Sequence, residues 1–366
     1  MNKKLLLVCN YASSYSGNFI SSIIRLIECA EKKGIHVFLC FPEKAKSCNW
    51  INTIQCEKAF MDFSSSKRTM LKKLSAFMKS KEISVVHLHF VAPVFGGFLK
   101  LLNPKAKVIV HIHSDFSALQ KVNMKTRFMD FLTFQIFRRG VVYLSVSSAL
   151  ASKRKLQFVP NALDADRVKK DPAGRAEIRS LLGVQDEEIL CMVFGWSPYV
   201  KGVDIAVEAV RSLHEAGKHN VKLAIVHGGK VDQDNMKIFI KEHTQCTGEE
   251  AYILYLPPTE DVFAYYNAAD VFVSSSRSEA FPYSILEALS IGKSVCSSDL
   301  PSVMWSAQFP LVQMFRSGDP ADLAERILDS VKNAHRDDRD AVAKNVVEKY
   351  DINCWCDTMI SHYLST

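Results

Sequence analysis

Residues 271–289 read VFVSSSRSEAFPYSILEAL, and this stretch decides the fold class of the sequence around it. The apolar run Val271–Ser274 has the length of a buried strand. A polar loop follows it, and Ser284–Ser290 then has the apolar spacing of a short helix. The stretch therefore predicts a strand, a loop and a helix in succession, which is one unit of a parallel α/β sheet.

The same alternation runs through the whole chain. Strands are expected at 5–9, 35–40, 85–89, 108–113, 141–146, 157–159, 189–194, 222–226, 252–256, 271–274 and 294–297. Helices are expected at 19–33, 69–79, 203–215, 239–245, 262–269, 284–290, 321–333 and 339–350. This rhythm predicts parallel sheets with helices on both faces. A length of 366 residues favours two doubly wound domains facing each other across a cleft.

The domain boundary is expected near 161–172, where strand signal gives way to polar residues between Pro160 and Pro172. We therefore expect a first domain at 1–163 and a second at 164–345. The remaining segment, 346–366, begins in a helical stretch and forms a third part of the chain.

Charge is distributed very unevenly between the two halves. Residues 1–160 contain 25 Lys and Arg against 8 Asp and Glu, a net charge of +17. Residues 161–366 contain 21 against 31, a net charge of −10. The asymmetry indicates either an anionic partner for the first half, such as an anionic membrane face, a phosphorylated lipid or nucleic acid, or a solvated basic surface. The sequence has no aromatic-basic motif of a known nucleic-acid-binding module, so we do not expect it to bind nucleic acid.

The cysteines and the apolar runs bear on the compartment. The ten cysteines are scattered without a Cys-x-x-Cys pair, which is typical of reduced thiols in a cytoplasmic protein. The apolar run after Met1 stops at Asn10, too early for a signal peptide, and no run approaches the length of a membrane span. We expect a cytoplasmic protein that could lie peripherally on the inner face of the membrane.

Two carboxylates of the opening stretch lie in different settings, Glu279 in the loop and Glu287 in the helix. Free N–H groups at the start of that helix can bind oxygen atoms of a ligand. The alternative is a pair of exposed glutamates at a helix end.

The stretch resembles the pattern S-x-x-E-G-F-P-x-x-x-L-E-A of the retaining glycosyltransferases of family four, also called glycosyl transferases group 1, which have the GT-B fold. Glu279, Phe281, Pro282 and Glu287 match it. The resemblance implies that Glu279 contacts the transferred sugar as a catalytic residue. It also implies that Glu287 binds the ribose hydroxyls of the nucleotide and that Phe281 and Pro282 belong to the donor site.

Other segments resemble the family in the same order. Residues 157–164 resemble V-I-P-N-G-V-D, and Gly195 to Asp204 resembles G-R-x(4)-K-G-x-D. Residues 223–229 resemble L-x-I-x-G-x-G, and 255–270 resembles F-x-G-x-V through Y-x-x-A-D. The resemblance implies that Lys201 neutralises the donor diphosphate. It also implies that Gly195, Gly228 and Leu256 contact the donor. The tail resembles the closing helix of the family, so 346–366 is expected to return to the first domain.

The chain departs from the family at two places. Trp196 stands where the family has Arg, so either Arg277 or another cation offsets the diphosphate, donor binding is weaker, or the indole stacks on a ligand. Only Gly17 remains of a glycine-rich turn after the first strand, which limits how closely the backbone approaches phosphates.

Histidines follow two strands of the first half. His113 resembles the family histidine that touches the sugar, and Asp115 could orient it. His87 and His89 repeat the pattern one strand earlier and share a face. Each could instead be a satisfied residue of the core or the cleft wall.

The apolar residues of 128–137 (FMDFLTFQIF) go nearly all round a helix, which favours a core helix. The other interpretation lays these aromatic residues and the neighbouring cations against a membrane leaflet.

The resemblance implies a hexosyltransferase that moves a sugar from a UDP-sugar to a hydroxyl of a glycan or lipid-linked acceptor, in the synthesis of surface polysaccharide or glycoconjugate. Configuration would be retained, and neither a metal nor a cofactor would be needed. Two rivals stay open: a catalytically degenerate partner subunit, and a metallohydrolase with the spacing His111-x-His113-x-Asp115.

Overall fold

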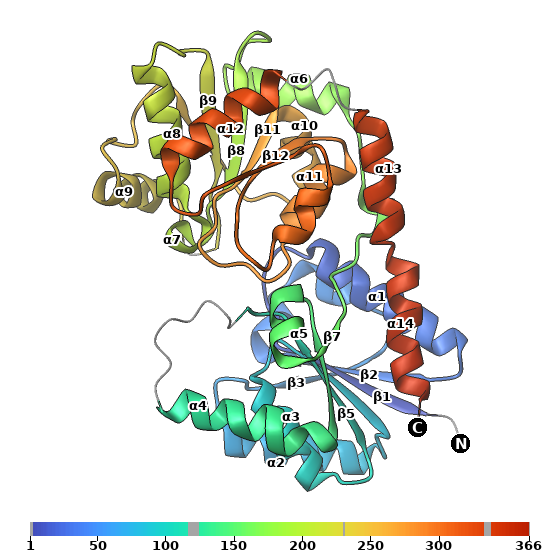
Figure 1. Cartoon of the computed structure of the whole chain (residues 1–366). Helices are drawn as coiled ribbons and strands as arrows, with labels where there is room; N and C mark the ends of the chain where they lie inside the picture. Colours follow the sequence, from blue (N-terminus) through green and yellow to red (C-terminus); the bar gives the residue numbers. More distant parts are fainter. Residues whose placement is uncertain (1–2, 116–123, 230, 333–337, 366) are drawn as a thin grey trace. The chain divides into compact units, whose positions relative to one another are not determined.

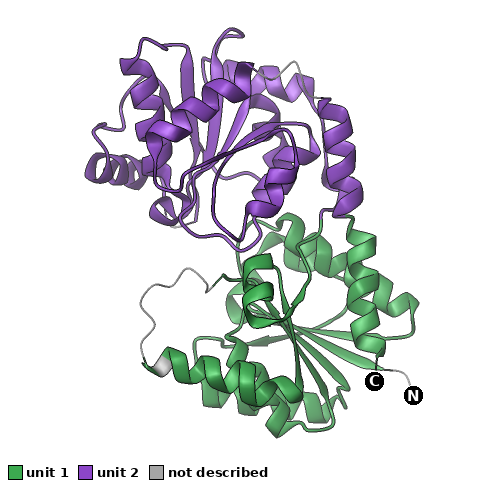
Figure 2. Ribbon diagram, in the orientation of Figure 1, with its two compact units in different colours: residues 1–162, 351–366 green, residues 163–350 purple. Residues whose placement is uncertain are grey.

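In the computed structural model of the chain, all residues are described except 1–2, 116–123, 230, 333–337 and 366 (Figure 1). The chain divides into two compact units (Figure 2). Unit 1 contains residues 1–162 and 351–366, and unit 2 contains residues 163–350. The sequence placed the boundaries after residues 163 and 345. Of the expected C-terminal segment, residues 351–366 belong to unit 1, whereas residues 346–350 belong to unit 2.

The described residues of unit 1 form a parallel seven-stranded sheet in the order β3-β2-β1-β4-β5-β6-β7. The strands are β1 (Lys4–Cys9), β2 (His36–Pro42), β3 (Glu57–Met61), β4 (Val85–His89), β5 (Lys107–Ile112), β6 (Val141–Ser145) and β7 (Gln157–Phe158). The chain leaves β1 toward one edge and returns to β4 on its other side, so the direction of winding reverses between β1 and β4.

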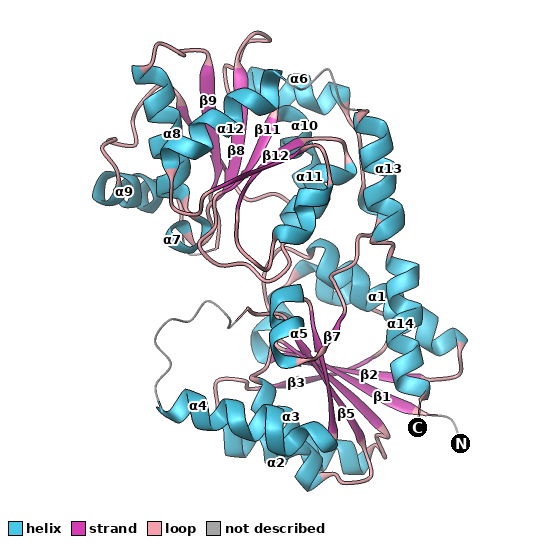
Figure 3. Cartoon of the chain, in the orientation of Figure 1, coloured by secondary structure: helices cyan, strands magenta, loops and turns pink. Residues whose placement is uncertain are grey.

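Helices cover both faces of this sheet (Figure 3). They are α1 (Gly17–Lys32), α2 (Lys67–Ser80), α3 (Pro93–Leu102), α4 (Met124–Phe131), α5 (Ser148–Arg154) and α14 (Ile352–Leu364). Apolar residues of β1, β4 and β5 such as Leu6, Val86 and Val110 form a core with α2, α3 and α5. The side chains that alternate with them face the side of α1 and α14, two helices that pack against each other.

The described residues of unit 2 form a parallel six-stranded sheet in the order β10-β9-β8-β11-β12-β13. The strands are β8 (Ile189–Phe194), β9 (Val221–Val226), β10 (Ile253–Leu256), β11 (Val271–Ser274), β12 (Ser294–Ser298) and β13 (Val312–Phe315). The helices are α6 (Pro172–Leu181), α7 (Pro198–Lys201), α8 (Val203–Glu215), α9 (Gln233–His243), α10 (Val262–Ala268), α11 (Tyr283–Ser290), α12 (Pro320–Lys332) and α13 (Arg339–Lys349). One face packs against α8, α9 and α12. The winding reverses between β8 and β11.

The prediction of two doubly wound α/β domains is confirmed. Several elements were not foreseen, among them β3, β13 and α6. The two strands are edge strands of only five and four residues, so their pattern is weak. Helix α6 had a usable signal, because Asp171 caps it by accepting from the N–H of Gly174 and Pro172 occupies its first position.

The core-helix prediction for 128–137 is wrong for most of its apolar residues. Phe128, Phe131 and Ile136 are 56%, 53% and 52% exposed, whereas Phe134 is buried. Helix α4 gives way to a π-helical turn at 132–136, which changes the spacing of the side chains along the surface. Apolar residues that go all round a helix can be buried only where a neighbour covers them, and here only one side is covered.

Candidate active site

The loops that follow β8 and β11 approach each other at the point where unit 2 reverses its winding. In parallel sheets, ligands bind beyond the carboxyl ends of the strands at such a point. The loop after β8 carries Trp196 and Lys201, and the loop after β11 carries Ser276, Arg277 and Glu279. Topology alone therefore gathers most of the residues that the sequence selected.

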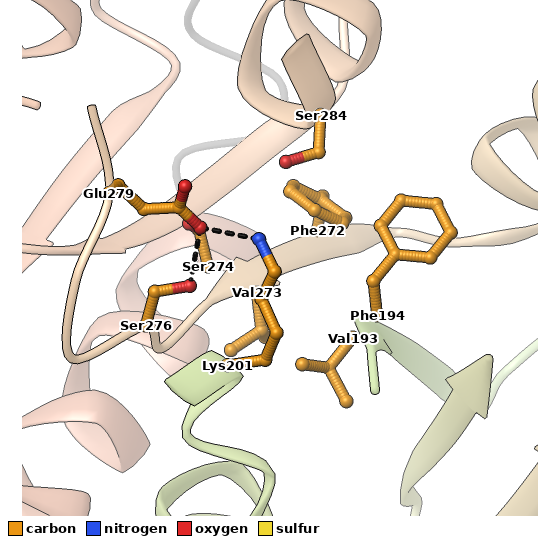
Figure 4. Close-up of a pocket in the computed structure, with 9 residues that line it drawn as sticks. All are labelled: Val193, Phe194, Lys201, Phe272, Val273, Ser274, Ser276, Glu279 and Ser284. Atoms are coloured by element: carbon orange, nitrogen blue, oxygen red, sulfur yellow. Dashed lines mark hydrogen bonds and ion pairs between the residues drawn. The ribbon is translucent and has the colours of Figure 1, made fainter. Parts of the chain in front are cut away.

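Lys201 and Glu279 form an ion pair at the floor of this site (Figure 4). The Nζ of Lys201 donates to Oε1 of Glu279 at 2.6 Å, and the hydroxyl of Ser276 donates to the same oxygen at 2.7 Å. The side chains of Lys201 and Glu279 are only 14% and 12% exposed. These residues line a pocket with an empty volume of about 190 Å³ together with Val193, Phe194, Phe272, Val273, Ser274 and Ser284. A cation and a carboxylate thus meet in a partly desolvated recess, where each acts strongly on a bound ligand.

The two loops are locked together through Gly202 and Ser275. Gly202 has φ of +64°, and a Cβ on it would lie 2.0 Å from the carbonyl oxygen of Ser275. The hydroxyl of Ser275 donates to the carbonyl oxygens of Lys201 and Gly202 at 3.0 and 2.8 Å. Only glycine allows this approach, and the contact fixes the backbone that presents Lys201.

Trp196 and Arg277 flank the ion pair in different ways. Trp196 is 47% exposed, and the Lys201 ammonium lies 4.5 Å from its ring centroid. Arg277 donates to both carboxylate oxygens of Asp204, at 2.7 and 2.5 Å, and stacks over Tyr199 at 4.2 Å. The guanidinium charge is therefore already matched by Asp204, which weakens the idea that Arg277 replaces the missing family arginine.

Glu287 lies behind the loop on α11 and is 4% exposed. Its Oε2 accepts a hydrogen bond from the hydroxyl of Tyr266 at 2.9 Å. Because a carboxylate is costly to bury, a nearly buried one with a fixed hydroxyl donor is a preorganised acceptor for further hydroxyl groups.

Phe281 and Pro282, by contrast, are packing residues in this structure. Phe281 is 3% exposed and stacks on Trp305 with ring centroids 4.2 Å apart. Pro282 is buried and directly precedes α11. They set the course of the chain from Glu279 to Glu287 and so act on the site through its backbone.

The three remaining donor residues expected in unit 2 end strands or follow them. Gly195 follows β8, and a Cβ there would lie 2.6 Å from Cε of Met236. Leu256 is the buried last residue of β10, and its carbonyl oxygen accepts from the N–H of His227 at 3.0 Å. Gly228 follows His227 in the chain and forms a β-bridge with Val231. All three lie at the carboxyl edge of the same sheet.

Gly17 and His113 belong to unit 1. Gly17 begins α1 with φ of +54°, where Tyr15 covers it so closely that a Cβ would lie 2.6 Å from its ring. His113 follows β5, where its ring stacks on Phe90 at 4.2 Å and its Nε2 shares a hydrogen bond with Nδ1 of His89 at 2.9 Å. Burial lowers the pKa of His113 well below its usual range.

The spacing His111-x-His113-x-Asp115 does not assemble a metal site among the described residues. Asp115 accepts from the hydroxyl of Ser147 at 2.9 Å, and neither Asp115 nor His113 belongs to the described cluster that could hold one ion. The described group of three side chains within reach of one ion is instead His87, His89 and His111. The geometry therefore disfavours the metallohydrolase that this spacing suggested.

Several residues of the site were not selected from the sequence. They are Ser276, which shares Glu279 with Lys201, Tyr266, which binds Glu287, and Ser302, whose hydroxyl donates to the carbonyl oxygen of Glu279 at 2.6 Å. Asp204 was noted only as part of a motif. The Ser276–Glu279 pairing had a usable signal, because these residues are the S-x-x-E at the start of the pattern that the stretch resembles. The other two pairings have none, because the partners of Tyr266 and Ser302 lie 21 and 23 residues away on other elements.

Solved structures of known proteins share this fold over nearly the whole chain. The structure of a glycosyltransferase from Rickettsia africae ESF-5 has a TM-score of 0.80 and 15% identity, covering 99% of this chain and 98% of that one. Anabaena HepE in complex with UDP-glucose has a TM-score of 0.78 and 15% identity, covering 98% of each chain. These likenesses show the fold: two Rossmann-like parallel sheets of the GT-B type.

At the level of sequence, residues 187–333 match the family model of the glycosyl transferases group 1. The matched range contains the motif around Glu279 and Glu287, so this part of the chain is similar to that family, in agreement with the resemblance seen in the sequence. A curated relative is the putative teichuronic acid biosynthesis glycosyltransferase TuaC of Bacillus subtilis (strain 168), 25% identical over 240 residues. The match covers 62% of this chain and 56% of TuaC, so the chain spans about half the length of that relative.

Proposed function

We propose that this protein is a retaining glycosyltransferase that moves a sugar from a UDP-sugar to a hydroxyl of a glycan or lipid-linked acceptor without a metal ion. The observation that carries the proposal is the Lys201–Glu279 pair at the point where the winding reverses, with Glu287 behind it on α11. The HepE structure that resembles this fold holds UDP-glucose, which supports a uridine donor. The match of residues 187–333 to the glycosyl transferases group 1 supports sugar transfer as the reaction type.

Lys201 is the residue we assign to the donor diphosphate. Phosphate oxygens compete with Glu279 for its ammonium group, and departure of the nucleotide leaves negative charge that this cation stabilises. Glu279, released from Lys201 and still held by Ser276, then has an oxygen free to accept hydrogen bonds from the sugar hydroxyls. The ion pair of the free protein is thus exchanged for two ligand contacts.

Glu287 is the residue we assign to the ribose. Two neighbouring hydroxyls can donate to one carboxylate, and Tyr266 holds that carboxylate in place. With Trp196 in place of arginine and Arg277 bound to Asp204, Lys201 is the cation of these loops that we expect to meet the diphosphate. We therefore expect modest donor affinity, with Trp196 free to stack on the ligand.

We assign the acceptor to unit 1, on its net charge and on His113. Exposed apolar residues of α4 and its continuation, Met124, Phe128, Phe131 and Ile136, lie among the exposed cations Arg127, Arg138 and Arg139. Aromatic residues with neighbouring arginines suit the surface of an anionic bilayer. We therefore propose peripheral contact with anionic lipid and a lipid-linked acceptor. Among the described residues, no helix is long and apolar enough to cross a bilayer.

A degenerate partner subunit remains the rival function, and Trp196 and the single Gly17 are the observations that favour it. Both concern donor binding, so donor binding separates the two proposals. The test is calorimetric titration of UDP, GDP and ADP in the presence of EDTA into the wild type, Glu287→Ala and Glu287→Gln.

Micromolar binding of UDP to the wild type, lost in Glu287→Ala and weakened about 10-fold to 100-fold in Glu287→Gln, is the expected outcome. The glutamine keeps an acceptor for Tyr266 and removes only the charge. A wild type that binds no nucleotide while folded, as judged by circular dichroism, would overturn the proposal and favour the degenerate subunit.

A further inference from the structure

Three histidines lie side by side inside unit 1, apart from the residues assigned to the donor. His87 and His89 lie on β4, where they alternate with core residues. His111 lies on the neighbouring strand β5, directly opposite His89. They occupy the face of the sheet on the side of α1 and α14. Their exposures are 0%, 0% and 1%. Each offers one ring nitrogen, and these three nitrogens lie within 4.8 Å of one another.

One nitrogen of each ring is held by a neighbour. Nδ1 of His87 shares a hydrogen bond with the Tyr363 hydroxyl at 2.7 Å, and Nδ1 of His89 shares one with His113 at 2.9 Å. Nε2 of His111 lies 3.2 Å from the carbonyl oxygen of Val159. A carbonyl oxygen only accepts, so this Nε2 carries the proton, and Nδ1 of His111 presents a lone pair.

The other nitrogen of each ring is buried without a hydrogen-bond partner in the part of the chain that the structure describes. These atoms are Nε2 of His87, Nε2 of His89 and Nδ1 of His111. Buried polar atoms almost always have a partner, and three orphaned nitrogens in one cluster call for a common explanation. Metal-binding histidines typically have this pattern, with the second ring nitrogen bonded to a carbonyl, carboxylate or hydroxyl.

Their charge state fits the same explanation. Burial lowers the pKa of His111 to about 4 and the pKa of His87 and His89 well below the usual range. Neutral imidazole is the form that binds a metal. Three imidazoles with an open fourth position form a ligand set that zinc accepts. His362 of α14 also has a buried Nε2 without a partner among the described residues, and it is near enough to His87 and His111 to act on them electrostatically.

We propose that His87, His89 and His111 form a binding site for a divalent transition-metal ion of the zinc class within unit 1. Around zinc at 2.0–2.1 Å the nitrogens would lie about 3.3 Å apart, so a small rotation of the rings closes the site. The ion would join β4 to β5, and through the Tyr363 hydroxyl it would also anchor the last turn of α14. Its role would be structural, and the proposal does not depend on the glycosyltransferase reaction.

The test measures metal binding by the full chain after chelator treatment and dialysis. Zn²⁺ is titrated calorimetrically, and Co²⁺ is followed by absorption. Variants keep the outer hydrogen bond and remove only the ligand nitrogen: His111→Gln retains a donor for Val159, and His89→Asn retains a partner for His113. His36→Asn, at an exposed histidine on β2, is the matched control.

One equivalent of metal should bind to the wild type and to His36→Asn in the micromolar range or tighter, with affinity falling at least about 100-fold in both ligand variants. Bound Co²⁺ should show visible bands without the strong near-ultraviolet absorption of thiolate ligands. This second readout is needed because the chain has ten cysteines.

Tyr363→Phe leaves all three ligand nitrogens in place, and we expect it to weaken binding about 10-fold to 100-fold. Tyr363→Phe also tests the proposal if the histidine variants do not fold. Absence of stoichiometric binding in the folded wild type, or a thiolate spectrum that persists in His111→Gln, would overturn the proposal.

Discussion

Lys201 donates to Glu279 across 2.6 Å, although 78 residues separate them and they stand on loops that follow different strands. Each side chain is the other's partner in a recess that admits little water. A ligand that binds Lys201 through a phosphate and Glu279 through a sugar would have to break this ion pair. The two halves of the pair should therefore respond differently to substitution.

Lys201→Met should weaken UDP binding about 10-fold to 100-fold, because it removes the cation for the diphosphate. It should also lower the free energy of unfolding by about 1–3 kcal/mol, since Glu279 loses a buried partner. Glu279→Gln should leave UDP binding within about threefold of the wild type, because Lys201 is no longer held by a charge, while sugar transfer falls at least about 100-fold. Calorimetry and a transfer assay measure the two effects. Equal loss of UDP binding in both variants would contradict the division of roles.

Trp196→Arg should strengthen UDP binding about 5-fold to 10-fold at low salt, because it places a second cation beside Lys201. The indole is 47% exposed, so its removal should cost little stability. The gain should shrink in about 0.5 M salt, since exposed charges are screened. Trp196→Gln controls for loss of the indole alone. If Trp196→Arg binds UDP more weakly than Trp196→Gln does, the indole contacts the ligand and the charge argument fails.

Gly202→Ala should lower the free energy of unfolding by more than about 2 kcal/mol and weaken UDP binding, because the new Cβ would meet the Ser275 carbonyl at 2.0 Å. Gly217→Ala is the matched control. Gly217 also has a positive φ, +77°, but nothing lies within 4 Å of its Cβ position. Gly217→Ala should lower the free energy of unfolding by only about 1–2 kcal/mol, because alanine is strained in the left-handed conformation, and it should leave UDP binding unchanged. Urea denaturation and calorimetry distinguish them, and equal effects on UDP binding would refute the locking contact.

Phe128→Ser combined with Phe131→Ser should reduce binding to vesicles of phosphatidylglycerol and phosphatidylcholine at least about 10-fold, because two aromatic side chains no longer enter the interface. Ile238→Ser, at a residue of α9 that is 54% exposed in unit 2, is the matched control. Cosedimentation measures both. Binding should also fall as salt rises. Wild-type protein that does not sediment with anionic vesicles would remove the membrane part of the proposed function.

Much of the fold followed from local pattern, because each strand and helix of a parallel sheet has its own periodicity. The run Val271–Ser274 and the helix after it are examples, found where expected within a residue. Edge strands such as Glu57–Met61 were missed, because an edge strand buries few side chains and so has no strong pattern. The stretch 128–137 was misassigned for a related reason: apolar content does not say whether a neighbour is present to cover it.

The sequence by itself determined the α/β class, the similarity of residues 187–333 to the glycosyl transferases group 1 and the residue types of the site, since these depend on order and spacing along the chain. Only the tertiary structure decided which side chains meet. It paired Arg277 with Asp204 instead of leaving it free for the donor, and it turned Phe281 into a packing residue. It also brought His87, His89 and His111 together with Tyr363, which lies 276 residues from His87. Contacts of this kind arise from the register of neighbouring strands and from the return of the C-terminal helix, and local sequence encodes neither.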